Sequence, residues 1–272
     1  MQPLISEIIR YIEYLNTQCG LSTTVHFSAN KIATLPESVT VALLKYSSHN
    51  NPYCIVVKSK AEGYRNCIKS QKRVLSKCGD EGSFCGSCYA GVYEYIHPVW
   101  EKGKAVGFVA VSGYQQTGRR VRIMDGKLYK SSLKEEPLPL EQVRAMIPPL
   151  ARMLEMLLEY PAENTDSEYN RILKYISDHY THLSLEQLCK QFGRSKSYIS
   201  HLFNEKTGMT LRGYCNRLKL GDAKKLLVQT NLPVTEIAFN TGFQDVSYFI
   251  SVFKDSTGLT PLKYRQKKLL DQ

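Results

Sequence analysis

The sequence predicts two domains, an N-terminal α+β domain built around an antiparallel sheet and a C-terminal all-α domain with two helix-turn-helix units. Three observations support this division. The chain has 272 residues, of which 43% are hydrophobic, and this length suits two separate cores. Apolar stretches typical of strands occur in the first half. The last third of the chain, in contrast, matches itself at an offset of fifty residues, which indicates a repeated helical unit.

The chain begins with a pattern that predicts an amphipathic helix. Apolar residues recur at helical spacing at Ile5, Ile8, Ile12 and Leu15. This pattern differs from that of a signal peptide, and no apolar run approaches the length of a membrane span. We therefore expect a soluble, cytoplasmic protein without a membrane partner.

Four apolar stretches that follow predict strands, at residues 39–46, 54–57, 91–100 and 105–114. The last two are separated by Lys102-Gly103-Lys104, which predicts a tight turn and an antiparallel hairpin. Residues 61–78 have the pattern of a helix. Together these elements predict an α+β fold of the kind found in sensor domains.

Five of the eight cysteines lie between residues 54 and 88. A reducing cytoplasm disfavours disulfides, so metal binding, redox chemistry and simple burial remain open. Cys85 and Cys88 form a Cys-x-x-Cys pair, which is the usual half of a zinc site. The metal interpretation adds two further ligands, so that zinc or an iron–sulfur cluster would be held by Cys54, Cys67, Cys85 and Cys88.

Between the predicted domains, apolar residues alternate steps of four and three, as in a coiled-coil seam. They are Val143, Ile147, Leu150, Leu154 and Leu157. Pro148 and Pro149 interrupt this pattern, and a proline inside a helix costs about 3 kcal/mol. We therefore expect a new helix to begin near Pro149 and to end at Tyr160. Its apolar edge could pair two subunits or pack on the sensor sheet, and pairing into a homodimer is slightly favoured. Residues 161–166 form the predicted hinge.

Each copy of the C-terminal repeat predicts two short helices joined by a tight turn. Ser197-Tyr198-Ile199 recurs as Ser247-Tyr248-Phe249, and Thr207-Gly208 recurs as Thr257-Gly258. The capping and turn signals are, in chain order, Ser184 with Gln187, Gly193, Ser195, Pro233, Gly242 and Asp245. They predict helix-turn-helix units at residues 184–206 and 233–257.

A helix of about 20 residues, from Thr210 to Gln229, is predicted between the two copies. At 1.5 Å per residue it spans roughly 30 Å. The major groove returns to the same face of B-DNA after about 34 Å. One rigid helix could therefore hold the second helices of the two helix-turn-helix units in successive major grooves of a single duplex.

Residues 167–268 resemble the AraC/XylS family of transcription regulators. The strongest match is AKKLLVQTNLPVTEIAFNTGFQDVSYFISVFKDSTGLTPLKYR, from Ala223 to Arg265. The resemblance implies binding to double-stranded promoter DNA and contact with RNA polymerase. It also implies that activation is the expected mode of regulation.

In each second helix, the apolar positions predict a buried face and leave a polar face outward, whose N-terminal part reaches base edges in helix-turn-helix proteins. The residues that we predict to contact DNA are Lys196, Ser197, Ser200, His201, Asn204, Arg212, Ser247, Tyr248, Ser251 and Lys254. Serine can contact more than one kind of base, so we expect these helices to make few base-specific hydrogen bonds. His201 and Asn204 are the best discriminators in the first unit.

The first half of the chain, about residues 5–155, resembles the PocR sensory domain. The matching segments are PYC at 52–54, EGYRNC at 62–67, CYAGVYEYIHPV at 88–99 and VGFVAVSGYQ at 106–115. The resemblance implies a PAS-like or GAF-like pocket for a small-molecule effector. Cys54, Cys67 and Cys88 would line it, together with Tyr89, which stands where the family commonly has a histidine.

The sequence thus predicts a one-component transcription regulator and not an enzyme. Residues 1–160 form the sensory domain with its linker helix, and residues 167–268 bind DNA. Two alternatives remain. In an Ada-like protein a zinc-bound thiolate accepts a methyl group from damaged DNA, although the cysteine spacing here differs from that family's pattern. In a metal or redox sensor the cysteine cluster itself detects the signal.

Overall fold

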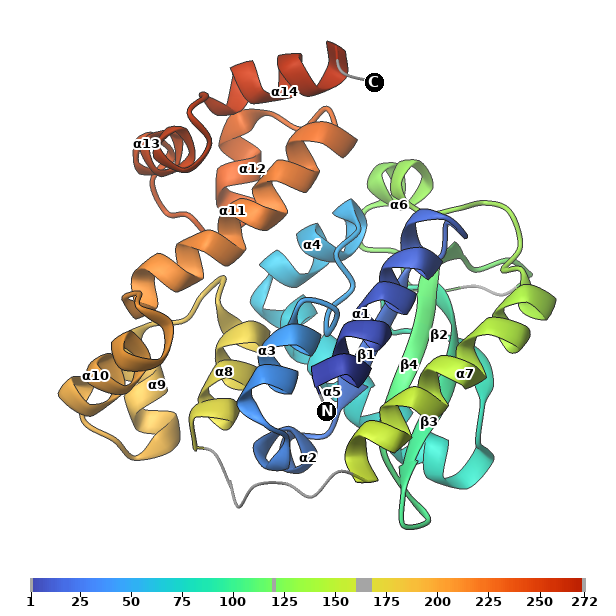
Figure 1. The fold of residues 1–272 in the computed structure, drawn as a ribbon. Coiled ribbons are helices and arrows are strands. Elements are labelled where there is room, and N and C mark those ends of the chain that lie inside the picture. The colour runs from blue at the N-terminus through green and yellow to red at the C-terminus, as the bar shows by residue number, and fades with distance from the viewer. Residues whose placement is uncertain (1, 119–120, 160–167, 271–272) are drawn as a thin grey trace. The chain divides into compact units, whose positions relative to one another are not determined.

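The computed structural model describes residues 2–118, 121–159 and 168–270 (Figure 1). The chain forms two compact units, one from Met1–His49 with Glu62–Lys174 and the other from Asn50–Ala61 with Tyr175–Gln272. The hinge predicted at residues 161–166 lies outside the described residues. None of the described helices is long and apolar enough to span a membrane.

The first unit contains a four-stranded antiparallel sheet with the strand order β1-β4-β3-β2. Its strands are β1 (Thr23–Phe27), β2 (Phe84–Ser87), β3 (Val92–Glu101) and β4 (Lys104–Gln115). The predicted hairpin is confirmed as β3 and β4. Lys102 and Gly103 have φ angles of 48° and 76° at its turn, where Glu101 pairs with Lys104.

Helices pack on both faces of this sheet. Helices α1 (Gln2–Thr17) and α7 (Leu140–Glu159) share a core with Val25, Val109 and Val111 on one face. On the other face, Cys78 of α5 (Ala61–Glu81) packs with Ile96 and Phe108. Helices α2 (Ala29–Thr34), α3 (Glu37–Leu44) and α6 (Gly126–Ser132) also belong to this unit. The predicted helices near residues 5–15 and 61–78 are confirmed as α1 and α5.

Two of the four predicted strands are wrong. Residues 39–46 fall largely in α3, and residues 54–57 lie in α4 (Pro52–Ser59). The second helix is started by local signals, because Asn51 Oδ1 accepts a hydrogen bond from the Cys54 amide and Pro52 occupies the first turn. Short apolar runs fit a buried helix as well as a strand, so their periodicity could not separate the two.

The linker helix also differs from its prediction. Helix α7 is continuous through Pro148 and Pro149 and does not begin anew at them. Ile147, Leu150 and Leu154 are completely buried in the core of the first unit. Burying one such side chain contributes about 1.5–3 kcal/mol, so several together offset the cost of the prolines. The predicted pairing of two subunits through these leucines is therefore wrong, and the alternative of packing on the sheet is correct.

A buried carboxyl on β3 makes the stability of the first unit depend on pH. Burial raises the pKa of Glu94 from 4.5 to about 8, and its Oε2 lies 3.7 Å from His49 Nε2. The folded state thus retains a proton that the unfolded chain releases, so the free energy of unfolding falls as pH rises from about 4.5 to 8. At about 1.4 kcal/mol per pKa unit, the loss is several kcal/mol.

We expect Glu94→Gln to remove most of this pH dependence, because the amide carries no titrating proton. Urea unfolding at pH 5 and pH 8.5 would measure it. An equally steep loss of stability in the variant would show that another group is responsible.

The second unit consists of helices. It includes α4, whose sequence lies within the predicted N-terminal domain, and residues of α8 (Glu168–His179) occur in both units. The Ser59 hydroxyl at the end of α4 lies 3.3 Å from Asn240 Oδ1, and the Ser59 carbonyl lies 2.7 Å from His182 Nε2. Residues 50–61 are thus tied to the helices that follow.

Candidate nucleic-acid interface

The two predicted helical hairpins are confirmed. The first consists of α9 (Leu185–Phe192) and α10 (Lys196–Thr207), and the second of α12 (Val234–Asn240) and α13 (Val246–Thr257). Ser184 and Gln187 form the expected capping box, and Gly193 ends α9 in the left-handed conformation. Ser195 and Asp245 cap the second helix of each pair by accepting hydrogen bonds from the Tyr198 and Tyr248 amides.

A single helix connects the hairpins. Helix α11 (Leu211–Gln229) is capped by Thr210 and has 19 residues, which corresponds to roughly 28 Å. Figure 1 shows α10 beside the end at which α11 begins. The first turn of α13 meets α11 through Tyr248, which contacts Arg212 and Asn216 in the first two turns of α11. Helix α14 (Pro261–Leu270) follows the second hairpin. The length of α11 is close to the roughly 34 Å after which the major groove returns to the same face of B-DNA.

Both copies use the same core contacts. Ile199 and Phe203 are buried residues of α10, and Phe249 and Phe253 are their buried counterparts on α13. The Phe203 and Tyr214 rings meet edge to face at 5.2 Å, and the equivalent rings of Phe253 and Tyr264 do so at 5.4 Å. The repeat in the sequence therefore reflects a repeat in the packing.

Most of the side chains predicted to contact DNA are exposed. They are Lys196, Ser197, Ser200, His201, Asn204, Arg212, Ser247, Ser251 and Lys254. Tyr248 differs, since it is only partly exposed. The contacts of all these side chains with bases or phosphates remain predictions.

Two of these exposed side chains have acidic neighbours. Lys196 Nζ lies 2.6 Å from Glu186 Oε1, and this hydrogen bond lowers the pKa of Glu186 to about 2 and raises that of Lys196. His201 Nδ1 lies 3.7 Å from Glu205 Oε2. A phosphate or base approaching either residue would have to compete with a carboxylate.

A groove of about 1070 Å³ runs between the hairpins. Ser200, Arg212 and Tyr248 line it, together with Asn216 and Lys219, which the sequence did not single out. Lys219 Nζ donates a hydrogen bond to the carbonyl oxygen of Gly242 at 2.8 Å. Burial lowers the pKa of Lys219. The sequence could not predict this hydrogen bond, because its acceptor lies 23 residues from Lys219.

The predicted effector residues lie on different elements of the first half. Tyr89 donates a hydrogen bond from its hydroxyl to the Gly63 carbonyl at 2.6 Å. Cys67 lies on α5, Cys85 on β2, and Cys88 directly follows β2. Cys85 and Cys88 together line a pocket of about 400 Å³ that also includes Tyr93 and Arg122. Cys54 lies on α4, which is part of the other unit.

The proposed metal ligands do not form a recognisable site within either unit. Within residues 2–118, 121–159 and 168–270, no group of three or more His, Cys, Asp or Glu side chains could hold a metal ion. None of the eight cysteines, all of which lie within the described residues, forms a disulfide. A four-cysteine site therefore remains a sequence prediction.

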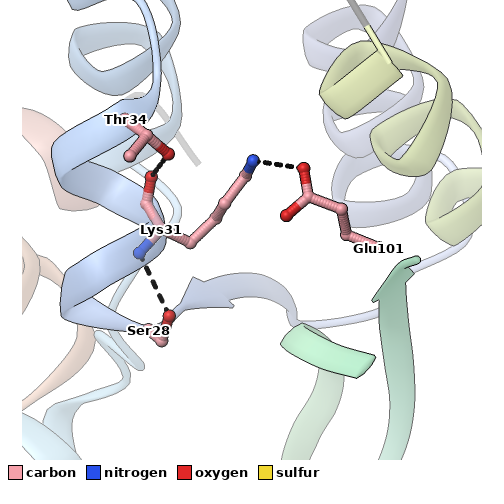
Figure 2. A network of polar contacts seen from close by, with 4 residues as sticks. All are labelled: Ser28, Lys31, Thr34 and Glu101. Atoms are coloured by element: carbon pink, nitrogen blue, oxygen red, sulfur yellow. Dashed lines mark hydrogen bonds and ion pairs between the residues drawn. The ribbon is translucent and has the colours of Figure 1, made fainter. Parts of the chain in front are cut away.

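The first unit contains a second cavity, of about 610 Å³, that the sequence did not indicate. Lys31, Trp100 and Glu101 line one side of it, and Arg152 and Glu155 line another. Figure 2 shows the ion pair in its wall, with Lys31 Nζ 2.6 Å from Glu101 Oε1. Ser28 and Thr34 hold the backbone of Lys31 through its amide and its carbonyl. The cavity has a size suited to a small molecule.

Comparison with known proteins gives matches of two kinds. Residues 188–267 match the model of a helix-turn-helix domain family. The chain is also 30% identical over 187 residues to the Xylose operon regulatory protein of Escherichia coli, covering 64% of this chain and 47% of that protein.

Two further relatives match shorter stretches. The HTH-type transcriptional activator RhaS of Escherichia fergusonii is 34% identical over 105 residues, or 38% of each chain. The Bifunctional transcriptional activator/DNA repair enzyme AdaA of Bacillus subtilis is 35% identical over 109 residues, or 39% of this chain and 52% of that one. The chain thus spans about half or less of the length of these relatives.

Proposed function

We propose that this chain, whose residues 188–267 are a helix-turn-helix domain of the AraC/XylS family, is a transcription regulator and not an enzyme. It would bind promoter DNA through α10 and α13 and respond to a signal received by its N-terminal half. The observation that carries this proposal is the pair of exposed polar helix faces joined by α11. Two relatives named as operon regulator and transcriptional activator support it and favour activation. RNA polymerase is the further partner that the resemblance to the family implies.

The N-terminal half, residues 1–160, is proposed to be a PocR-like sensory domain with a PAS-like or GAF-like fold. An antiparallel sheet with helices on both faces supports this assignment. The effector would be a small molecule near Cys67, Cys88 and Tyr89. Cys54, the fourth residue predicted to line this pocket, lies in the other unit, and its role stays a prediction. The cavity beside Lys31 and Glu101 is another place where a small molecule could bind.

The Ada-like alternative is less well supported. The similarity to AdaA extends over 109 residues and leaves most of this chain unmatched. The Ada-like alternative also expects a zinc-bound thiolate, and no cluster of three metal-binding side chains occurs among the described residues. Zinc analysis of the native protein and a methyl-transfer assay on damaged DNA would test it directly.

The DNA-binding role is tested by selecting duplexes from a random library with the full-length protein and mapping its footprint. We expect one subunit to protect two major-groove segments about one helical turn apart. His201→Ala should cost on the order of 1–3 kcal/mol of binding free energy and relax specificity in one segment only. Lys206 lies at the exposed end of α10. Lys206→Ala should instead weaken binding to all duplexes equally and make the affinity less dependent on salt concentration.

Failure to select any preferred duplex would contradict the proposed function. A footprint confined to one groove segment per subunit would contradict the role of the second hairpin. Equal losses across all sequences for His201→Ala would assign that residue to phosphate contact.

A further inference from the structure

One face of α11 is directed toward the second hairpin. Arg212, Asn216 and Lys219 are spaced four and three residues apart, so their side chains share one side of the helix. Residues 212, 216 and 219 line the groove between the hairpins together with Tyr248 and the turn at Gly242. Each of the three contacts a residue of the second hairpin or of its turn.

Tyr248, in the first turn of α13, receives two of these contacts. Asn216 Nδ2 donates a hydrogen bond to the Tyr248 hydroxyl at 2.8 Å. The Arg212 guanidinium carbon lies 4.7 Å from the centre of the Tyr248 ring, within the range of a cation–π interaction. The hydroxyl and the ring of Tyr248 are thus both held by α11.

Lys219 provides the third contact, one turn further along α11. Its ammonium group donates to the Gly242 carbonyl at 2.8 Å and lies 5.6 Å from the Phe243 ring centre. Gly242 and Phe243 belong to the turn between α12 and α13, and the Phe243 ring packs on Phe249 at 5.0 Å. The start of α13 is therefore attached to α11 at two points, the turn and Tyr248.

The equivalent tyrosine of the first hairpin has different surroundings. Tyr198 is 42% exposed, and the side chain stacked on it at 5.0 Å is Arg194, which comes from the turn of its own hairpin. In the second hairpin, the stacked arginine comes from α11 instead. The two copies of the repeat are thus attached to the connecting helix in different ways.

We infer that Tyr248 and Asn216 are positioning residues that fix the orientation of α13 on α11 and thereby set the spacing between the two half-sites that the protein accepts. This inference rests on the proposed DNA-binding function. A rotation of α13 about α11 would move its outward residues along the groove, and the Asn216–Tyr248 hydrogen bond opposes that rotation. Tyr248 acts in this way through α13, and the neighbouring Ser247 and Ser251 face the duplex.

The test uses the full-length protein and a duplex selected by it from a random library. Further duplexes lengthen the segment between the two protected regions by one and two base pairs. We expect the inserted base pairs to weaken binding of the unaltered protein by about tenfold or more. The reason is that α10 and α13, held at a fixed distance, cannot both contact their half-sites when one half-site is displaced along the duplex. The quantity measured is the ratio of the dissociation constants for the lengthened and the selected duplex.

Tyr248→Phe and Asn216→Ala each remove the same hydrogen bond, and we expect each to reduce that ratio by about three- to tenfold. Tyr248→Phe keeps the ring and its stacking on Arg212, so it provides the test even if Asn216→Ala lowers stability. Tyr198→Phe is the matched control, and its ratio should equal that of the unaltered protein. A merely structural role would lower the affinity for all duplexes without changing the ratio.

An unchanged ratio in Tyr248→Phe, with the two-groove footprint intact, would overturn the inference and leave the proposed function standing. An equal reduction in Tyr198→Phe would overturn it as well, because the effect would not depend on α11. If no duplex is selected at all, the proposed function and the inference fail together.

Discussion

Leu154→Lys should unfold the first unit, whereas Met156→Lys, two positions further along the same helix, should leave it folded. Leu154 is completely buried in the core that α7 shares with α1 and the sheet, while Met156 is 44% exposed. A buried ammonium group without a partner costs several kcal/mol, which is a large part of the 5–15 kcal/mol that stabilises a typical domain. The exposed lysine should change the free energy of unfolding by less than about 0.5 kcal/mol.

Thermal unfolding of the two variants would measure this difference, and sedimentation would give their mass. A folded Leu154→Lys protein with half the mass of the unaltered protein would show that the leucines of α7 pair two subunits. The burial of Leu150 and Leu154 within one chain predicts the opposite, namely loss of the fold without a defined change in association.

The sequence predicted the C-terminal helices well because their ends are marked by local chemistry. The capping box at Ser184 and the caps at Ser195 and Asp245 occur as expected, and the repeated Gly208 and Gly258 are left-handed at the ends of α10 and α13. Each of these signals acts over three or four residues and does not depend on the rest of the fold. The outward faces of α10 and α13 followed from the same short-range periodicity.

Elements that depend on distant partners were predicted less well. Residues 39–46 and 54–57 are apolar and short, and they became helices where the sequence suggested strands. Strands β1 and β2 have only five and four residues, and they take their conformation from pairing with β4 and β3. The inclusion of residues 50–61 in the second unit has no local signal either.

The same distinction applies to the candidate site. Positions such as His201 and Ser251 could be found because a helical period separates buried from exposed faces. Asn216 and Lys219 could not, because their partners, Tyr248 and Gly242, are 32 and 23 residues away. The guanidinium of Arg265 likewise donates to the carbonyls of Leu227 and Leu232, which lie 38 and 33 residues away. Long-range polar contacts of this kind require the folded chain.

Gly242→Ala should cost the second unit far more stability than Gly258→Ala, although both glycines have a left-handed backbone. Gly258 has a φ of 74° and open space around its Cα, so alanine there meets only the conformational penalty of about 1–2 kcal/mol. Gly242 has a φ of 86°, and a Cβ on it would lie 2.3 Å from the carbonyl oxygen of Thr181.

The clash at Gly242 involves backbone atoms, which cannot rotate away as a side chain can. Relief requires the turn between α12 and α13 to move away from Thr181, between α8 and α9, and this movement would also break the hydrogen bond from Lys219. We therefore expect Gly242→Ala to lower the free energy of unfolding by about 3 kcal/mol or more and to abolish high-affinity DNA binding. Urea unfolding and titration with a selected duplex would measure both effects. Equal losses in the two variants would show that the backbone at Thr181 moves aside without a measurable cost in stability.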